Sequence, residues 1–272
     1  TTCTGSCTSL TGAVAPGRLA DMLLIPDVKK IDPRVVICRG KVAFENGQTL
    51  FKGRSHVYSM ESQNTFRFSR DFDASDFRII SPGADTVQKV RVIEMVTDLV
   101  TKELHLEISA VNGEIPADAA ATLCKVAAIN RRNPPGKIFT GLIKGFGLKS
   151  GAFASSAAWD VSDIIVVGCT DADIAQAVNR LRALQGGAVL CDGGQILAEM
   201  ELPIFGLLSD LPMETLAGQM IALRSTAAER GVSFPDPFLS LNALTGAAIP
   251  YLRICSEGLV NLKDGKVSGI FI

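Results

Sequence analysis

The residues that most directly suggest metal chemistry are the two histidines, His56 and His105. His56 lies in the polar run Gly-Arg-Ser-His, whereas His105 lies in an alternating run that is typical of a strand. A metal centre that activates water needs several histidine and carboxylate ligands close together, and neither histidine has a second one nearby in the sequence. We therefore expect a structural or exposed role for both histidines, and no metal ligands in this chain.

The strongest candidate for a binding site is the polar segment Ser-Ser-Ala-Ala-Trp-Asp-Val-Ser-Asp at residues 155–163, directly before an apolar run. Asp160 can hydrogen-bond a ligand, or it can cap the turn with its carboxylate. Trp159, the only tryptophan, can form a flat wall for a planar ligand, or it can pack in the core or an interface. The candidate ligand contacts are Ser155, Ser156, Trp159, Asp160 and Ser162. We identify no catalytic residue.

Three other patterns resemble functional sites. Arg131-Arg132-Asn133-Pro134-Pro135-Gly136 can bind an anion, but such a sequence is more typical of a solvated turn. Residues 141–151 contain four glycines without the spacing of a nucleotide-binding loop, which favours close backbone packing or a mobile lid. Glu199 and Glu201 alternate with apolar neighbours, so they predict one solvent-facing side of a strand rather than a catalytic pair.

Seven cysteines are scattered along the chain, and several of them lie in apolar runs. This pattern is typical of small buried side chains in a reducing cytoplasm. The alternative is that Cys3 and Cys7 form half of a zinc site, for which the sequence shows no second half.

The composition is that of a well-packed globular protein, with 47% hydrophobic and 20% charged residues and a net charge of −1. No run of one charge suggests a nucleic-acid partner, and no apolar run is long enough to span a membrane. Residues 1–7 lack an initiator Met and the pattern of a signal peptide. We therefore expect a cytoplasmic protein and a truncated or processed chain.

Hydrophobic periodicity divides the chain into three parts: a small β unit at residues 1–51, a linker with short strands at 52–84 and a mixed-sheet α+β domain at 85–272. In the first part, strand runs flank a tight turn at Arg39-Gly40. In the second part, residues 65–70 alternate like a half-exposed strand.

The third part mixes strand and helix patterns. Thr170-Asp171-Ala172-Asp173 has the spacing of a capping box and begins a helix that Gly186-Gly187 ends. A second helix is predicted from about Pro212 to Arg230, and hairpins are predicted at residues 192–194 and 264–265. Strands are predicted at 90–96, 103–108, 123–129, 138–143 and 164–168.

Residues 12–50 resemble the closing segment of an amidohydrolase. The resemblance rests on Gly-Ala-Val-Ala-Pro-Gly-Arg-Leu-Ala-Asp-Met-Leu-Leu-Ile-Pro-Asp from residue 12 and on Val-Val-Ile-Cys-Arg-Gly-Lys-Val-Ala-Phe-Glu-Asn-Gly from residue 35. In that superfamily such a segment follows a metal-binding (β/α)8 barrel. The resemblance implies that this chain is the back portion of a larger enzyme, with the barrel as its missing partner. An unpaired edge of the small β unit would then favour self-association or disorder near the N-terminus.

A second resemblance is to the C-terminal domain of bacterial adenine deaminases. It begins with Lys-Gly-Phe-Gly-Leu-Lys-Ser-Gly at residues 144–151 and continues through Ile-Ile-Val-Val-Gly at 164–168. It includes Leu-Pro-Ile at 202–204 and ends near Asp-Pro-Phe-Leu at 236–239. Together the two resemblances cover nearly the whole chain.

The loop at residues 155–163 departs from the pattern of that family, which reads Ser-Ser-x-Ala-His-Asp-Ser-His-Asn. Asp160 matches the family pattern. Trp159 and Ser162 stand where the two histidines are expected, and Asp163 replaces the Asn. These departures put in doubt the role of the loop in a neighbouring active site.

The resemblance implies an enzyme that hydrolyses adenine to hypoxanthine and ammonia, using a divalent metal (manganese, iron or zinc) held by the barrel. The chain by itself is then expected to hold no cofactor and to be inactive. A purine base is the implied ligand, a homo-oligomer is the implied assembly, and no nucleic acid or membrane is implied. Two alternatives stay open: a non-catalytic assembly or binding module, and a divergent deaminase of another base.

Overall fold

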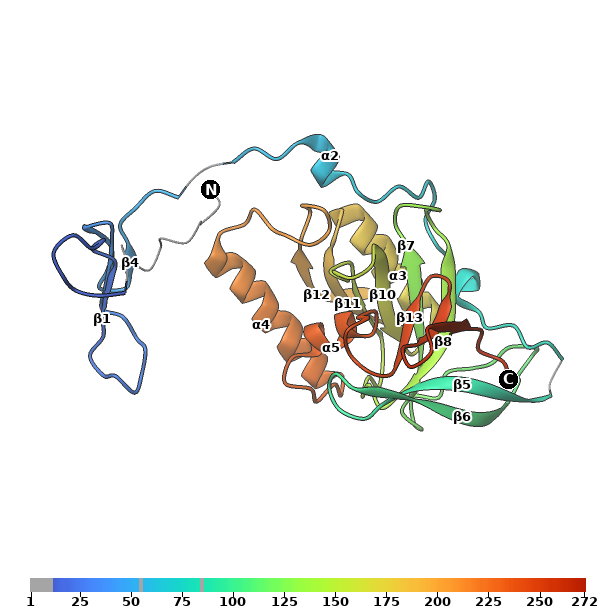
Figure 1. Cartoon of the computed structure of the whole chain (residues 1–272). Coiled ribbons are helices and arrows are strands. Elements are labelled where there is room, and N and C mark those ends of the chain that lie inside the picture. The colour runs from blue at the N-terminus through green and yellow to red at the C-terminus, as the bar shows by residue number, and fades with distance from the viewer. Residues whose placement is uncertain (1–11, 54–55, 84–85) are drawn as a thin grey trace. The chain divides into compact units, whose positions relative to one another are not determined.

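The computed structural model of the chain describes residues 12–53, 56–83 and 86–272 (Figure 1). The chain forms two compact units, Thr1–Val57 and Tyr58–Ile272. No helix in the described part of the chain combines the length and the apolar character that crossing a membrane requires.

The first unit is a four-stranded antiparallel sheet with the strand order β1-β2-β3-β4. Arg39 and Gly40 form the predicted tight turn, and both have positive φ. Leu23 and Leu24 of the edge strand β1 are exposed, as is Phe51. This sheet confirms the predicted small β unit. Its strands are β1 (Met22–Leu24), β2 (Val35–Cys38), β3 (Lys41–Glu45) and β4 (Gln48–Thr49).

The second unit is built on an eight-stranded sheet with the order β12-β11-β9-β10-β7-β8-β5-β6 (Figure 1). All neighbouring strands are antiparallel except β5 and β8, which are parallel. The mixed sheet confirms the predicted α+β class. Its strands are β5 (Val87–Met95), β6 (Thr101–Ser109), β7 (Leu123–Asn130), β8 (Ile138–Lys144), β9 (Ala152–Ser155), β10 (Asp163–Gly168), β11 (Gly187–Asp192) and β12 (Gln195–Glu201).

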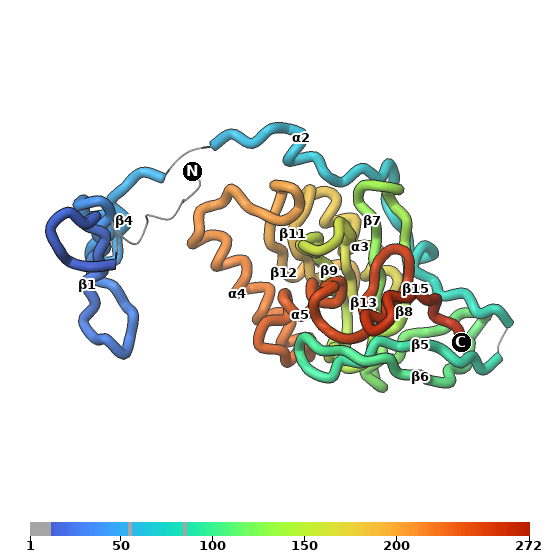
Figure 2. Tube along the Cα trace, in the orientation of Figure 1, coloured from blue at the N-terminus to red at the C-terminus, as the bar shows by residue number. Residues whose placement is uncertain are grey.

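Helices cover both faces of the central strands (Figures 1 and 2). Helix α3 (Asp171–Leu184) contributes to the apolar cluster on one face. Helices α4 (Met213–Glu229) and α5 (Pro237–Ala243) contribute to the cluster on the other face. Because both faces are covered, the central strands read as continuous apolar runs rather than as alternating ones.

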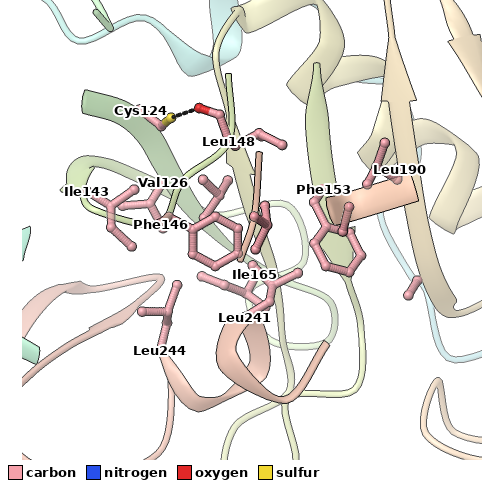
Figure 3. Packing of buried hydrophobic residues seen from close by; sticks show 14 of the residues in the cluster. Cys124, Val126, Ile143, Phe146, Leu148, Phe153, Ile165, Leu190, Leu241 and Leu244 are labelled. Carbon is pink, nitrogen blue, oxygen red and sulfur yellow. Dashed lines mark hydrogen bonds between the residues drawn. The ribbon is translucent and has the colours of Figure 1, made fainter. Parts of the chain in front are cut away.

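The side chains of β10 show how the two clusters are divided. Ile165 and Val167 belong to the cluster beneath α4 and α5, whereas Ile164 and Val166 belong to the cluster beneath α3. Figure 3 shows Ile165 beside Phe146 and Leu241 in the first cluster. The period of two along a strand therefore places every second residue in each core.

A three-stranded antiparallel sheet closes the second unit, formed by β13 (Leu252–Cys255), β14 (Gly258–Asn261) and β15 (Lys266–Ser268). Asn261 pairs with Lys266, which confirms the predicted hairpin at residues 264–265. In the same way, Asp192 pairs with Gln195 in the predicted hairpin at residues 192–194.

Both long helices were predictable from their ends. Thr170 is the N-cap of α3, and its hydroxyl accepts a hydrogen bond of 3.1 Å from the Asp173 N–H. The helix ends one residue before Gln185, which has φ 59° and takes the left-handed cap position that we expected a glycine to occupy. Helix α4 begins after Pro212 and ends at Glu229, as predicted.

The strand predicted at residues 65–70 is wrong. The expected alternation is present, because Phe66 and Phe68 are buried in the α3-side cluster. The backbone, however, pairs with no neighbouring strand: the Arg67 N–H donates to the Arg131 carbonyl at 3.2 Å, and Phe66 N–H donates to a side chain. The segment covers a sheet face and therefore cannot extend the sheet. It is flanked by the short helices α2 (Met60–Gln63) and η1 (Ala74–Phe77).

The glycines of residues 141–151 serve close backbone packing. A Cβ atom on Gly147 would lie 2.8 Å from the Gly231 carbonyl oxygen, and a Cβ on Gly151 would lie 2.1 Å from the Cys191 carbonyl oxygen. Both glycines also have positive φ, at 96° and 75°. This observation confirms the first of the two explanations that the sequence offers for this segment.

A pair of glycine substitutions tests this packing. Gly151→Ala should lower the free energy of unfolding by about 2 kcal/mol or more, because it adds a clash to an unfavourable φ. Gly218→Ala, in an open position on α4, should raise it by about 0.5–1 kcal/mol, because alanine favours the helix. Urea unfolding of both variants measures the difference, and equal effects would contradict the packing argument.

Candidate functional site

The loops that carry the predicted site residues meet at one end of the central sheet. There β9 ends at Ser155, β10 begins at Asp163 and β7 ends at Asn130. Residues from these loops and from the loop after β12 surround a cleft of about 280 Å³. Its walls include Arg131, Arg132, Trp159, Asp160, Ser162 and Phe205.

Trp159, Asp160 and Ser162 are the predicted residues that line this cleft. Trp159 is 53% exposed, so its ring lies at the surface rather than in the core. Asp160 accepts a hydrogen bond of 2.9 Å from the Ala247 N–H through Oδ2, which ties the loop to the segment after α5. Asp160 is exposed, so its carboxylate is also accessible from the cleft.

The other two predicted residues, Ser155 and Ser156, are fully buried. The Ser155 hydroxyl donates to Asn242 Oδ1 at 2.8 Å. The Ser156 hydroxyl donates to the Gly206 carbonyl at 2.8 Å and accepts from the Gly187 N–H at 2.8 Å. The structure therefore engages both hydroxyls inside the protein, where they join the loop to α5 and to the loop after β12.

Arg131 is a site residue that the sequence did not reveal. We expected it to belong to a solvated turn, but its side chain is only 3% exposed, whereas Arg132 is exposed. It continues the alternation of β7 from Ile129, which lies in the α3-side cluster, and that alternation is the signal that could have identified it.

The Arg131 guanidinium connects three segments of the cleft. Its Nε donates to the Ser162 carbonyl at 2.9 Å, and its Nη1 donates to the Phe205 carbonyl at 3.0 Å. It also lies 5.2 Å from the centroid of the Phe66 ring, within the range of a cation–π contact. Burial, helped by the charge of Arg132, lowers the pKa of Arg131 to about 10, so the group stays charged at neutral pH.

A second cleft, of about 510 Å³, is adjacent to the first and shares Arg132, Val161 and Ser162 with it. Its buried acid is Asp163, which accepts hydrogen bonds from the Ser256 N–H at 2.7 Å and from its hydroxyl at 3.4 Å. Burial raises the pKa of Asp163, although the bonds from Ser256 and the charge of Arg131 act in the opposite direction.

An apolar groove of about 290 Å³ lies elsewhere, against α4 and α5, and its walls include Phe153, Met200, Met220 and Phe238. None of the predicted site residues lines it. We place the candidate site at the loop end of the sheet instead, because polar and charged side chains converge there beside an exposed aromatic ring.

The described residues offer no donor set for a catalytic metal. His105 Nε2 lies 2.7 Å from Glu103 Oε1 on the surface, and His56 is exposed. Among residues 12–53, 56–83 and 86–272, no three His, Cys, Asp or Glu side chains are grouped so that they could hold a metal ion. Cys3 and Cys7, the alternative half of a zinc site, lie outside the described residues. The divalent metal that the family resemblance assigns to the barrel therefore finds no such group of ligands among these described residues.

The remaining acidic pair behaves as predicted. Glu199 and Glu201 share one side of β12, with buried Met200 between them. Glu199 accepts two hydrogen bonds of 2.7 Å from the Arg180 guanidinium, which lowers the pKa of the Glu199 carboxyl. The two glutamates therefore lie on one face of a strand, and Glu199 forms an ion pair with Arg180.

Residues 98–266 match the family described as the adenine deaminase C-terminal domain. The chain belongs to this family. Three relatives named adenine deaminase are similar to it. The Dehalococcoides mccartyi (strain 195) protein is 38% identical over 94% of this chain and 44% of its own length. The Methylobacterium nodulans protein is 39% identical over 95% of this chain and 44% of its own length. The Moorella thermoacetica protein is 34% identical over 94% of this chain and 43% of its own length. This chain, a member of the adenine deaminase C-terminal domain family, therefore spans less than half the length of each of these relatives.

Replacement of Arg131 tests its role in holding the cleft. Arg131→Lys should lower the free energy of unfolding by about 2 kcal/mol, because lysine cannot make the same set of directed bonds. It should also shift the fluorescence of Trp159, the only tryptophan. Arg132→Lys is the matched control and should change stability by less than about 0.5 kcal/mol. Equal denaturation curves and equal fluorescence spectra for the two variants would show that Arg131 does not hold the cleft in shape.

The buried carboxyl of Asp163 predicts a pH dependence of stability. Its raised pKa means that the folded protein holds the proton more tightly than the unfolded chain. The stability that this provides is fully present below the ordinary Asp pKa and is lost as the pH rises through the raised value. Asp163→Asn should therefore gain stability relative to the parent over that interval, measured by thermal unfolding at several pH values. If the stability difference between Asp163→Asn and the parent stayed constant over these pH values, the raised pKa of Asp163 would be contradicted.

Proposed function

We propose that this chain is the C-terminal part of an adenine deaminase-type hydrolase that converts adenine and water to hypoxanthine and ammonia. Membership in the adenine deaminase C-terminal domain family is the observation that carries the proposal. The relatives named adenine deaminase are more than twice as long, which leaves room for a separate catalytic portion. We propose that the chain alone is inactive.

The proposed task of this chain is to form a wall of the substrate pocket. Trp159 presents a planar, exposed ring in the cleft, and a purine base can stack on such a ring. The Asp160 carboxylate beside it can accept a hydrogen bond from an amino or ring N–H group of the base. Arg131 holds the backbone at Ser162, two residues after Asp160, and at Phe205 in another loop of the cleft, so the wall is preorganised.

The catalytic water would be activated in the remaining part of the protein. A divalent metal, which we propose to be manganese, iron or zinc, supplies hydroxide near neutral pH in hydrolases of this kind. The donor set of the described residues does not fit such a metal. What this chain can contribute is exclusion of bulk water and contact with the base.

Exposed apolar side chains support the proposed partner, which is the metal-binding barrel of the intact hydrolase. Around the cleft, Trp159, Phe205 and Leu208 are each more than half exposed. In the separate β1–β4 unit, Leu23 and Phe51 are more than half exposed. Trp159 and Phe205 line the same cleft, and large apolar side chains that are exposed together can mark an interaction site. We also propose self-association through the open edges of the β1–β4 sheet.

One structural observation favours a second candidate function, the deamination of a base other than adenine. Trp159 and Ser162, which replace the two histidines of the family pattern, both line the cleft. A ring and a hydroxyl recognise different groups from those that two imidazoles recognise.

We further propose a cytoplasmic location, because the described cysteines are free thiols.

A chimeric enzyme tests the proposal. In it, this chain replaces the matching part of the Dehalococcoides mccartyi relative, and ammonia release is measured with adenine and other amino-substituted bases. We expect turnover by the chimera and none by the chain alone. Turnover by the chain alone would refute the division of labour, and a folded chimera that deaminates another base but not adenine would favour the second candidate.

Substitutions of Trp159 and Asp160 then test whether these side chains contact the substrate. Trp159→Ala in the chimera should lower kcat/KM by about tenfold, because loss of a stacking contact costs about 1 kcal/mol or slightly more. Asp160→Asn should raise KM, because the amide is a weaker acceptor than the carboxylate. Tyr251→Ala is the matched control, since this exposed ring lies outside the cleft. If kcat and KM were unchanged in both cleft variants, the loop would have only a structural role, and the proposed contact with the base would be wrong.

A further inference from the structure

Two thiols of the central sheet lie next to each other. The Sγ atoms of Cys124 and Cys169 are 3.8 Å apart, although 45 residues separate them in the chain. Cys124 is in β7 and is 1% exposed, whereas Cys169 directly follows β10 and is partly exposed. The pair therefore joins a buried thiol to one that solvent reaches.

The strand register places the two cysteines directly opposite each other. Lys125 pairs with Gly168 in the antiparallel ladder, so Cys124 and Cys169 occupy the next position. The Cys169 N–H donates to the Gly151 carbonyl on the other side of β10, at 2.9 Å. The position is therefore a non-hydrogen-bonded one, in which opposite Cα atoms are about 4.5 Å apart and the side chains approach closely. That separation is within the range of about 4.4–6.8 Å that disulfides span.

Both thiols point at the same acceptor. Cys124 Sγ lies 3.4 Å and Cys169 Sγ lies 3.6 Å from the Leu148 carbonyl oxygen, as Figure 3 shows for Cys124. The two side chains are thus already rotated toward a common point. The sulfur separation of 3.8 Å and the shared acceptor therefore favour a disulfide between these two residues.

We propose that Cys124 and Cys169 form an oxidation-sensitive dithiol that hydrogen peroxide converts into a cross-strand disulfide. The sulfur of Cys169, the partly exposed residue of the pair, takes one oxygen of the peroxide, the O–O bond breaks, and a sulfenic acid and one water form. The sulfur of Cys124 then attacks the Cys169 sulfur, forming the S–S bond and releasing the second water. Peroxide is reduced by two electrons, the two thiols supply them, and both thiol protons end in water.

The surroundings of the pair set the rate of this reaction. The hydrogen bond between the two thiols raises the pKa of Cys169 and lowers the pKa of Cys124, and burial raises the pKa of Cys169 further. Cys169, which reacts first with peroxide, therefore carries little thiolate near neutral pH, so the first step should be slow and should accelerate as the pH rises. Of the other described thiols, Cys38 is exposed and Cys191 donates to the Asp173 carbonyl at 3.2 Å.

Peptide mapping of the whole chain after peroxide treatment tests the proposal. Free thiols are blocked in denaturant and the protein is digested without reductant. We expect one linked peptide pair containing Cys124 and Cys169, a mass loss of two hydrogen atoms, and a decrease of two in the titratable thiols from the initial seven. Treatment with a reductant should restore all of them.

Two variants distinguish this pair from random oxidation. Cys169→Ser should abolish the linked peptide, whereas Cys191→Ser, the matched control from strand β11 of the same sheet, should leave it unchanged. The proposal is overturned if Cys169 ends as a sulfinic acid or is linked to another cysteine. It is equally overturned if the pair stays reduced at a peroxide dose that oxidises Cys38 and Cys255. The mapping of the unsubstituted chain decides these outcomes even where a variant fails to fold.

Discussion

The Arg131 guanidinium is the interaction on which the geometry of the candidate site depends. It is a buried cation, and its hydrogen bonds reach the backbone before β10 and the backbone of the loop after β12. An unpaired charge in this position would be strongly unfavourable, so both loops are held wherever their carbonyls can satisfy it. The positions of Trp159 and Asp160 follow from this constraint, because they lie only a few residues before Ser162.

The sheet provides the rigid base from which this cation projects. Its central strands are packed on both faces, so the strand ends at Asn130 and Asp163 are fixed. Asn130 then shapes the turn beyond β7, because its Oδ1 accepts from the N–H groups of Arg132 and Asn133, both at 2.9 Å. Buried hydroxyls of Ser155 and Ser156 anchor the facing loop. A site built on such supports keeps its shape without a ligand.

The sequence was sufficient to predict the elements whose local signals agree with their tertiary environment. Helix α3 has a capping residue, an apolar stripe and a glycine after its end, and it forms within one residue of the expected bounds. The double-sided core explains why β7 and β10 were recognisable as unbroken apolar runs. The family resemblance was also visible in residues 144–239, and the family match agrees with it.

The elements that were missed depend on contacts distant in the sequence. Residues 65–70 alternate as a strand does, but whether they pair depends on a neighbouring edge, which no local pattern specifies. Ser155 and Ser156 resemble exposed polar residues until the positions of Asn242 and Gly206 are known. Arg131 continues the alternation of β7, but the groups that contact its side chain, Phe66 and the loop after β12, are distant in the sequence.

We propose that the cleft of Trp159 and Asp160 faces the rest of the intact enzyme and forms part of its substrate pocket. Hydroxyl-radical footprinting measures this directly, by comparing oxidation of Trp159 in the chain alone and in the chimera with the Dehalococcoides mccartyi portion. The account predicts high reactivity in the isolated chain, where the ring is 53% exposed, protection in the chimera and further protection when adenine is added. Equal reactivity of Trp159 in the isolated chain and in a catalytically active chimera would contradict it.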